Sequence, residues 1–394
     1  MASDSNARLP KQMHAADPRL APLETPALIL DEARMRRNIK RLADRIASLG
    51  VTLRPHLKTA KSVEIARLML ENGTGPATVS TLAEAEAFAG AGVSDIVYAV
   101  GIAPQKLDRV AAIRSRRCDL SVILDSAEQA HAVAEASTRH QAPIPALIEI
   151  DSDGHRGGVT AIDNGLVEIG RILHDGGAEL RGVLTHAGES YNVSGTEGHA
   201  AFAEQEREAA VRAAESLQTA GLPCPIVSVG SSPTAHAVQS LDGVTEVRAG
   251  VYVFFDLVQA GIGTCDIEDI ALSVLATVIG HQPAKGWVIT DAGWMATSRD
   301  RGTADQTVDQ GYGLVCDEAG NVVPDLIVIE ASQEHGIVGR RPGSTRSMPD
   351  FPVGTRLRIL PNHACATASQ FTHYSVIPPD AGTPLKTWSR ITGW

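Results

Sequence analysis

The feature that most constrains this fold is an alternation of short β-rich runs with amphipathic helical stretches, repeated eight times between about residues 51 and 256. Such alternation predicts parallel strands joined by helices. Eight units fit a (β/α)8 barrel, which usually takes roughly 250 residues. The predicted strands are LRPHLKT, ATVST, DIVYAV, LSVILD, ALIEID, LRGVLTH, IVSVG and EVRAGVY.

An open, doubly wound parallel sheet is the alternative arrangement of the same units. That fold commonly carries a GxGxxG turn after its first strand, where a helix N-terminus binds a dinucleotide. The first strand here continues into HLKTAKS and contains no such turn. The sequence therefore favours the closed barrel.

The pattern changes after Phe255, where strand-like runs follow one another and helical patterns nearly vanish. These runs are IALSVLATVIGH, GWVITDAGW, GLVCDEAGNVV, DLIVIEASQEHGIV and TRLRILPNHACAT, separated by glycine, asparagine and proline signals. They predict a second, mostly β domain. We expect an N-terminal arm at 1–24, the barrel at 25–258 and the β domain at 259–394. The early strand at 25–32 fits either domain.

Charge and cysteine usage narrow the class of partner and the compartment. The formal net charge of −11 argues against a nucleic-acid partner. No run approaches the roughly 18 apolar residues of a membrane span. The five cysteines are scattered and form no CxxC pair, which predicts a reducing, cytoplasmic compartment.

In barrels of this type chemistry gathers where the strands end. The first predicted strand carries His56 and Lys58, which share one face because they are two residues apart. A lysine at this place either extends its ammonium group to solvent or acts as a nucleophile. Nearby cations such as Arg54, His56 and Arg156 favour the second role, because they lower the pKa of an amine.

Small residues follow the seventh and eighth strands, where such barrels usually bind phosphate. Taken alone, GSSPT is more often a turn with a helix cap; its pairing with RAGVY favours a phosphate site. A lysine together with a phosphate site indicates pyridoxal 5′-phosphate. The residues suited to this site are Gly230, Ser231, Ser232, Thr234, Gly250 and Val251.

Several segments together resemble a known family. They are RPHLKTAKS, DSDGHRGGV, LTHAGESY, VSVGSSPT, EVRAGVY, DAGWMATSRDRGT, EHGIV and LPNHACA. The chain is similar, from about residue 24 to its end, to the D-serine dehydratase and D-threonine aldolase group. These are fold-type III pyridoxal-phosphate enzymes related to alanine racemase.

The resemblance implies that Lys58 is the Schiff-base lysine and the general base of the reaction. It also places Arg156 near the phenolic oxygen of the cofactor and Arg248 near the ring nitrogen, where an arginine would discourage full protonation. The complete set of expected cofactor-binding residues is Lys58, His56, Arg156, Tyr191, Gly230, Ser231, Ser232, Thr234, Arg248, Gly250 and Tyr252.

The second domain contains PNHAC, in which His363 and Cys365 share one face of a predicted strand. An isolated histidine beside a cysteine is usually an ordinary pair. The resemblance, however, implies that these two positions bind zinc, or another divalent metal. Imidazole and thiolate suit zinc, and two protein ligands leave positions open for water and substrate.

The resemblance implies a dehydratase that acts on D-3-hydroxy amino acids, with zinc binding the β-hydroxyl as it leaves. The expected reaction converts D-threo-3-hydroxyaspartate to oxaloacetate and ammonia, and D-serine to pyruvate and ammonia. The alternative is a metal-dependent D-threonine aldolase, which yields glycine and an aldehyde. Aldolases of the group tend to carry Asp where this chain has Cys365, so the cysteine favours the dehydratase. The family also implies a homodimer.

A β-carboxylate on the substrate requires cations or several hydrogen-bond donors. The candidates are His186, Arg299, Arg301 and His335. Two other classes of protein remain as alternatives. A non-catalytic pyridoxal-phosphate binding protein would lack the second β domain and its PNHAC. A cofactor-free zinc hydrolase would carry His-x-His after the first strand, where this chain has His56 and Lys58.

Overall fold

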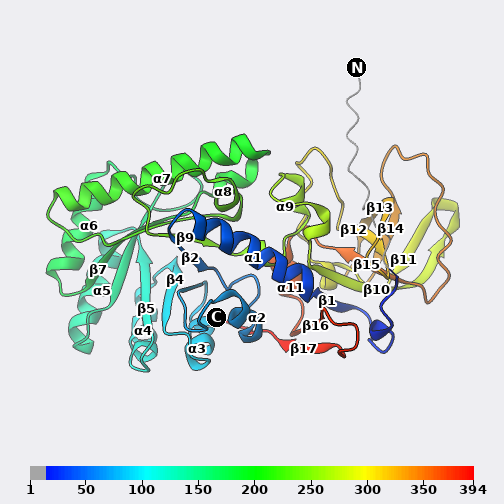
Figure 1. Cartoon of the computed structure of the whole chain (residues 1–394), viewed down its shortest axis with the longest axis horizontal. Helices are drawn as coiled ribbons and strands as arrows, with labels where there is room; N and C mark the ends of the chain where they lie inside the picture. The colour runs from blue at the N-terminus through cyan, green and yellow to red at the C-terminus, as the bar shows by residue number, and fades with distance from the viewer. Residues whose placement is uncertain (1–14) are drawn as a thin grey trace, which may run out of the picture. The chain divides into compact units, whose positions relative to one another are not determined.

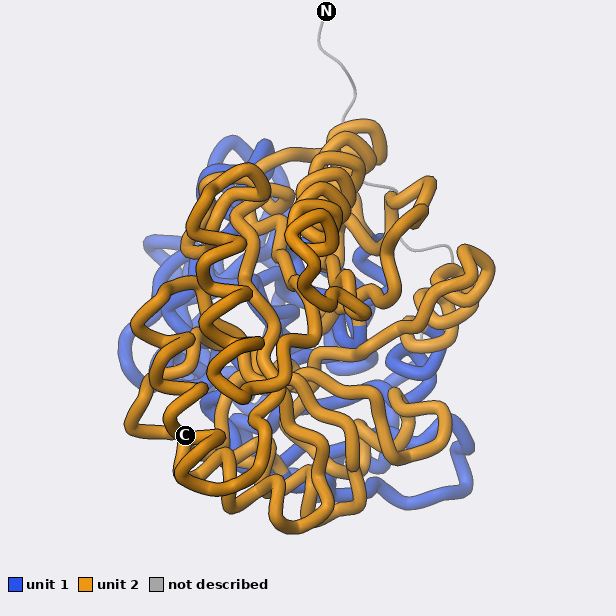
Figure 2. The backbone as a smooth tube through the Cα atoms, turned by 90° about the vertical axis from the view of Figure 1, so that its left-hand side faces the viewer, with its two compact units in different colours: residues 1–37, 253–261, 265–389 blue, residues 38–252, 262–264, 390–394 orange. Residues whose placement is uncertain are grey.

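The structure is a computed structural model that describes residues 15–394 (Figure 1). Residues 1–14, which make up most of the predicted N-terminal arm, lie outside the described residues. The chain forms two compact units, coloured separately in Figure 2. The barrel unit comprises residues 38–252, 262–264 and 390–394. The β unit comprises residues up to 37, 253–261 and 265–389.

The barrel unit contains eight parallel strands in the order β2-β9-β8-β7-β6-β5-β4-β3. A parallel bridge between His56 and Thr78, with a hydrogen bond of 2.8 Å from Leu57 N to Thr78 O, joins β2 to β3. The sheet therefore closes, which confirms the predicted (β/α)8 barrel and excludes the open sheet. The strands are β2 (Thr52–Pro55), β3 (Ala77–Val79), β4 (Asp95–Gly101), β5 (Asp119–Leu124), β6 (Pro145–Ile150), β7 (Glu179–Thr185), β8 (Ile226–Val229) and β9 (Glu246–Ala249).

Helices alternate with these strands, and side-chain caps fix where several of them begin. The Thr81 hydroxyl accepts a hydrogen bond from Glu84 N, and the Ser126 hydroxyl accepts one from Gln129 N. No helix within residues 15–394 is long and apolar enough to cross a membrane. The helices are α1 (Glu32–Ser48), which crosses the boundary of the units, α2 (Val63–Met69), α3 (Leu82–Gly90), α4 (Leu107–Arg114), α5 (Ala127–His140), α6 (Asn164–Asp175), α7 (Thr196–Thr219) and α8 (Ser232–Ala237).

The β unit is built on a nine-stranded sheet, which agrees with the prediction of a second, mostly β domain. Strand β1 belongs to it, pairing antiparallel with β10 and parallel with β16, which resolves the alternative left open for residues 25–32. Strands β10, β11, β14, β13, β12 and β15 pair in a closed antiparallel ring. The elements are β1 (Ala27–Asp31), β10 (Leu272–Gln282), β11 (Trp287–Thr290), β12 (Leu314–Asp317), β13 (Val322–Ala331), β14 (Gly336–Arg340), β15 (Arg356–Leu360), β16 (His373–Ile377), β17 (Lys386–Ser389), α9 (Leu257–Gly261), α10 (Trp294–Thr297) and α11 (Ala364–Ala368).

Apolar packing supports both units. In the barrel unit, β4 to β7 each contribute one buried residue to a single cluster, namely Val97, Ile123, Leu147 and Leu184. In the β unit, Leu20 packs with Ile29 and Leu275. Leu20 is fully buried, so this residue of the predicted arm attaches it to the sheet of the β unit.

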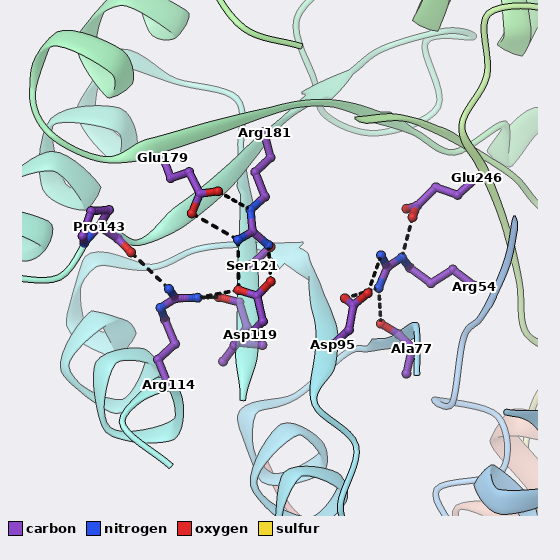
Figure 3. A network of polar contacts seen from close by, with 11 residues as sticks. Arg54, Ala77, Asp95, Arg114, Asp119, Ser121, Pro143, Glu179, Arg181 and Glu246 are labelled. Carbon is purple, nitrogen blue, oxygen red and sulfur yellow. Dashed lines mark hydrogen bonds and ion pairs between the residues drawn. The ribbon is translucent and has the colours of Figure 1, made fainter. Parts of the chain in front are cut away.

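Charged networks connect the first residues of several barrel strands (Figure 3). Arg54 on β2 donates to Glu246, the first residue of β9, at 2.8 Å, and to Asp95, the first residue of β4, at 2.7 Å. Arg181 on β7 similarly pairs with Asp119, the first residue of β5, at 2.7 Å. Strand N-termini in such barrels serve stability rather than chemistry. These networks therefore hold neighbouring strands in register.

We predict that Arg54→Met destabilises the barrel unit by about 3–5 kcal/mol, because it leaves the buried Glu246 carboxylate without its guanidinium partner. Arg114→Met is the control, since Arg114 pairs with a half-exposed Asp119 and such pairs contribute up to about 1 kcal/mol. The double variant Arg54→Met, Glu246→Met should recover part of the loss. Urea unfolding followed by circular dichroism measures all three. Equal losses of unfolding free energy for Arg54→Met and Arg114→Met would contradict the stabilising role given to the buried Arg54–Glu246 pair.

Candidate active site

The segment after β2 places Lys58 at the C-terminal end of the barrel. The prediction of one continuous strand through LRPHLKT is wrong, because β2 ends at Pro55 and residues 57–60 form a turn. Lys61 N donates to Leu57 O at 2.8 Å, which closes that turn. As a result Lys58 does not extend from a strand face, and its side chain is exposed rather than buried.

Two histidines near Lys58 are held in the neutral state. Burial, followed by the charges of Lys58 and Arg248, keeps the pKa of His56 well below its usual value. Burial also lowers the pKa of His186 to about 3. His186 Nδ1 lies 2.9 Å from Gly230 O, and a carbonyl can only accept, so Nδ1 carries the hydrogen and Nε2 is an acceptor.

A buried chain of polar groups connects β9, β8 and β7. Arg248 donates to the Ser228 hydroxyl at 2.6 Å and to the carbonyl of Thr185. The Ser228 hydroxyl in turn donates to Glu246 at 2.6 Å. Burial lowers the pKa of Arg248 to about 10, a value at which it remains a cation at neutral pH. Arg248 is therefore a fixed positive charge inside the barrel.

The loop after β8 is tightly constrained. Gly230 has φ +141, and a Cβ atom there would lie 2.0 Å from Arg248 O, so only glycine fits. Ser231 caps α8 by accepting from Thr234 N at 3.2 Å, while Ser231 N donates to the Thr234 hydroxyl at 3.0 Å. A third contact joins Ser231 to the Ser190 hydroxyl at 2.9 Å. Side chains rather than solvent therefore fix the conformation of this loop.

Glu206 on α7 is a buried residue that the sequence analysis did not identify. Its Oε1 accepts from Ala187 N at 3.0 Å and from Gly230 N at 2.8 Å, and its Oε2 accepts from the Thr234 hydroxyl at 2.9 Å. Burial raises the pKa of Glu206, while these donors act in the opposite direction. One carboxylate thus joins the loop after β7, the loop after β8 and helix α8. The Gly230 N–H and the Thr234 hydroxyl are already engaged by it.

Several buried polar atoms of the barrel unit have no hydrogen-bond partner among residues 15–394, and Ser232 Oγ, Tyr252 OH and Thr78 Oγ1 are among them. Leaving such an atom unsatisfied costs about 1–3 kcal/mol, so each calls for an explanation. Gly250 lies two residues before Tyr252 in the chain, and a Cβ atom there would come within 3.1 Å of His56 O. These atoms are suited to a polar ligand bound at the C-terminal end of the strands.

Two further predicted cofactor residues occupy loops of the barrel unit. Arg156 follows β6 and pairs with Glu149 at 3.1 Å, with 62% of its side chain exposed. Tyr191 follows β7, and its ring centroid lies 6.3 Å from that of His186. The barrel unit therefore contains every predicted cofactor residue, together with His186.

The predicted metal pair lies in the β unit, but not on a strand. Strand β15 ends at Leu360, His363 is the N-cap of α11, and Cys365 lies in the first turn of that helix. The prediction that both share a strand face is therefore wrong. His363 Nδ1 bonds to Asp300 Oδ2 at 2.7 Å. Burial opposes the charged form, but hydrogen bonds to Asp300 and Cys365 raise the pKa of His363 to about 11.

The remaining substrate candidates are also in the β unit. Arg301 pairs with Asp309 at 2.5 Å and stacks over Tyr312, so its charge is already compensated. Arg299 is exposed and lies over the Trp294 ring at 5.2 Å. His335 is exposed in the turn that precedes β14. Arg299 is thus the better of the two arginines for recognising a carboxylate.

Sequence reasoning missed three carboxylates that bond to the predicted site residues or to the backbone beside them. Glu206 does so in the barrel unit, and Asp300 and Asp256 do so in the β unit. Glu206 stands among several exposed glutamates of an amphipathic helix and has no local signal that distinguishes it. Asp300 lies between two arginines in SRDRGT, and these cations are the more recognisable candidates for binding a carboxylate. Only tertiary contacts reveal these roles.

Comparison with known proteins gives the family. The alanine racemase N-terminal domain family matches residues 30–258, and a putative serine dehydratase domain matches residues 271–377. D-threo-3-hydroxyaspartate dehydratase of Delftia sp. (strain HT23) is 55% identical, covering 95% of this chain and 99% of that protein. D-serine dehydratase of Schizosaccharomyces pombe is 31% identical, covering 92% of each chain. D-threonine aldolase of Arthrobacter sp. is 30% identical, covering 91% and 90%.

Solved structures agree with these sequence matches. The Delftia D-threo-3-hydroxyaspartate dehydratase superposes with a TM-score of 0.92 at 55% identity, covering 95% of this chain and 99% of the other. Two variants of a D-threo-3-hydroxyaspartate dehydratase also match at a TM-score of 0.92; one replaces a histidine by alanine, and the other replaces a cysteine by alanine and is metal-free. The chain therefore belongs to the alanine racemase-like family that includes the D-threo-3-hydroxyaspartate dehydratases, the D-serine dehydratases and the D-threonine aldolases.

Proposed function

We propose that this chain is a pyridoxal-phosphate- and metal-dependent dehydratase that converts D-threo-3-hydroxyaspartate to oxaloacetate and ammonia, with D-serine as a second substrate. The observation that supports this most strongly is the 55% identity to a D-threo-3-hydroxyaspartate dehydratase over 95% of the chain. The site residues give independent support, because the barrel unit and the β unit each carry chemically suitable groups.

The barrel unit fits the cofactor. Ser232 Oγ, Tyr252 OH and Thr78 Oγ1 are buried and have no partner in the part of the chain that the structure describes, and each is a hydroxyl that bonds readily to a phosphate or a pyridine substituent. Gly250 allows close approach of the backbone. Pyridoxal phosphate, when bound, supplies an electron sink for the negative charge that develops at the substrate Cα. The chain holds it through Lys58, with Arg248 providing a fixed positive charge.

Lys58 and Lys61 lie three residues apart, and their surroundings differ. Lys61 Nζ pairs with the fully buried carboxylate of Glu84 at 3.1 Å, and an ion-paired ammonium is a poor nucleophile. Lys58 is exposed in the turn that follows the closing bridge of the barrel. We assign to Lys58 Nζ both the bond to the cofactor and the removal of the Cα proton. The neutral His56 and His186 beside it add no positive charge that would repel the proton.

The β unit fits a metal. His363 and Cys365 offer imidazole nitrogen and thiolate sulfur, a donor set that favours zinc over magnesium or manganese. The two matching variants replace a histidine and a cysteine two positions apart, the spacing of His363 and Cys365, and the cysteine variant is described as metal-free. Zinc at this pair would act as a Lewis acid on the β-hydroxyl, which leaves as hydroxide.

An aldolase with the same parts would break the Cα–Cβ bond instead. The D-threonine aldolase of Arthrobacter is 30% identical to this chain, against 55% for the dehydratase. The sequence argument from Cys365 favours the same choice. Arg299, exposed above Trp294, is our candidate for binding the β-carboxylate. The cytoplasmic location remains a prediction from the sequence, and the homodimer remains what the family resemblance implies.

We predict that the purified protein, supplied with pyridoxal phosphate and zinc chloride, releases ammonia and oxaloacetate from D-threo-3-hydroxyaspartate faster than ammonia from D-serine or D-threonine. Chromatographic identification of the products checks this. Removal of zinc with a chelator should abolish ammonia release, and zinc should restore it. Glycine with glyoxylate from the first substrate would contradict the dehydratase and support the aldolase.

We predict that Glu206→Ala weakens pyridoxal-phosphate binding about tenfold or more. The reason is that the Ala187 N–H, the Gly230 N–H and the Thr234 hydroxyl would lose the carboxylate that accepts their hydrogen bonds. Glu206→Gln should bind more tightly than Glu206→Ala, since one amide oxygen can still accept both backbone N–H groups. Glu208→Ala removes an exposed carboxylate from the same helix and is the control. Titration of the apoprotein, followed by absorbance, gives the dissociation constants. Equal constants for Glu206→Ala and Glu208→Ala would contradict this role.

A further inference from the structure

The loop at residues 298–302 holds Asp300 in a fixed position beside His363. Asp300 N donates to the Ser298 hydroxyl at 2.9 Å, and Gly302 N donates to Asp300 Oδ1 at 2.9 Å. The other oxygen, Oδ2, bonds to His363 Nδ1 at 2.7 Å. The two oxygens therefore have separate tasks: one is fixed by its own loop, and the other holds the imidazole.

A carboxylate on Nδ1 determines which nitrogen of the ring can bind a metal. Because Nδ1 carries the hydrogen of this bond, Nε2 is the nitrogen that can bind a metal ion, once the ion has displaced any proton there. The carboxylate also orients the ring and makes Nε2 more basic. A histidine without such a partner would rotate about its side-chain torsions and change tautomer. Asp300 thus preorganises one of the two expected ligands.

A second carboxylate fixes the backbone between the two ligands. Asp256 accepts from Ala364 N at 2.9 Å and from Gln259 N at 3.0 Å, and it is almost fully buried. The Thr367 hydroxyl on α11 also donates to Thr297 O at 2.8 Å, which ties the helix to the segment that leads to Asp300. Backbone and imidazole are therefore positioned by different groups.

The number of ligands makes this positioning important. Among residues 15–394, no group of three or more histidine, cysteine, aspartate or glutamate side chains converges to hold a metal ion. On the proposed assignment the metal has two protein ligands, so a loss of order in one of them would remove half of the protein's coordination. Asp300 Oδ2 is bonded to Nδ1, and the proposed assignment leaves the other ring nitrogen for the metal.

We propose that Asp300 is the positioning residue of the metal site, holding His363 so that Nε2 coordinates the metal. This rests on the proposed function, which assigns the metal to His363 and Cys365. It adds a residue that acts through the histidine and touches neither substrate nor ion. The dependence of metal affinity on Asp300 is its direct consequence.

The test is zinc binding by the holoenzyme, measured by competition with a chromophoric chelator, for Asp300→Ala and Asp300→Asn. We expect Asp300→Ala to weaken zinc binding about 10- to 100-fold. Asp300→Asn keeps an oxygen that accepts from Nδ1, so its loss should be clearly smaller. Asp305→Asn makes the same charge change at an exposed position five residues farther along the chain and should bind zinc as the unaltered protein does. Circular dichroism confirms that each variant is folded.

Cobalt(II) titration provides a second readout that does not depend on activity. The absorption of a cobalt–thiolate bond should appear in Asp300→Ala, because Cys365 is intact, but only at higher cobalt concentration. Zinc affinity of Asp300→Ala within twofold of the unaltered protein would overturn the role of Asp300. Equal losses in Asp300→Ala and Asp305→Asn would also overturn it, since charge alone would then explain the effect. Absence of zinc binding by the unaltered protein would instead overturn the metal assignment on which the inference rests.

Discussion

The closing bridge between β2 and β3 is the contact on which the rest of the barrel site depends. His56 N donates to Ala249 O on β9 at 2.7 Å, and Leu57 N donates to Thr78 O at 2.8 Å. The same two residues thus complete the ring of strands and end β2. The chain must then turn, which places Lys58 directly after the seam. Barrel closure and placement of the lysine are therefore one structural event.

The interior of the barrel is charged as well as apolar, and the charges have a clear order along the strands. Arg54 and Glu246 form a buried pair near the strand starts, and Glu246 continues through Ser228 to Arg248. A buried ion pair is costly unless its hydrogen bonds are satisfied, and here each group has several partners. These contacts hold the positively charged Arg248 in the part of the barrel where the cofactor is expected to bind.

Much of this architecture follows from residue order. Eight strands of apolar residues alternating with helices predict the barrel, and Lys58 is a recognisable candidate because it lies at the end of the first predicted strand in a motif that resembles the family. The errors are local. His363 and Cys365 were expected on a strand, but proline and asparagine before them end β15 and α11 begins instead. Glu206 and Asp300 were missed because their roles depend on partners far away in the sequence, such as Gly230 and His363.

The central claim is that Lys58 carries the cofactor. The most direct measurement is borohydride reduction of the purified holoenzyme, which fixes a lysine-linked pyridoxyl group, followed by proteolysis and mass spectrometry of the labelled peptide. The account predicts a single labelled residue, Lys58, with Lys61 unlabelled because it remains paired with Glu84. A label on Lys61 or on another lysine, or the absence of any label, would contradict it.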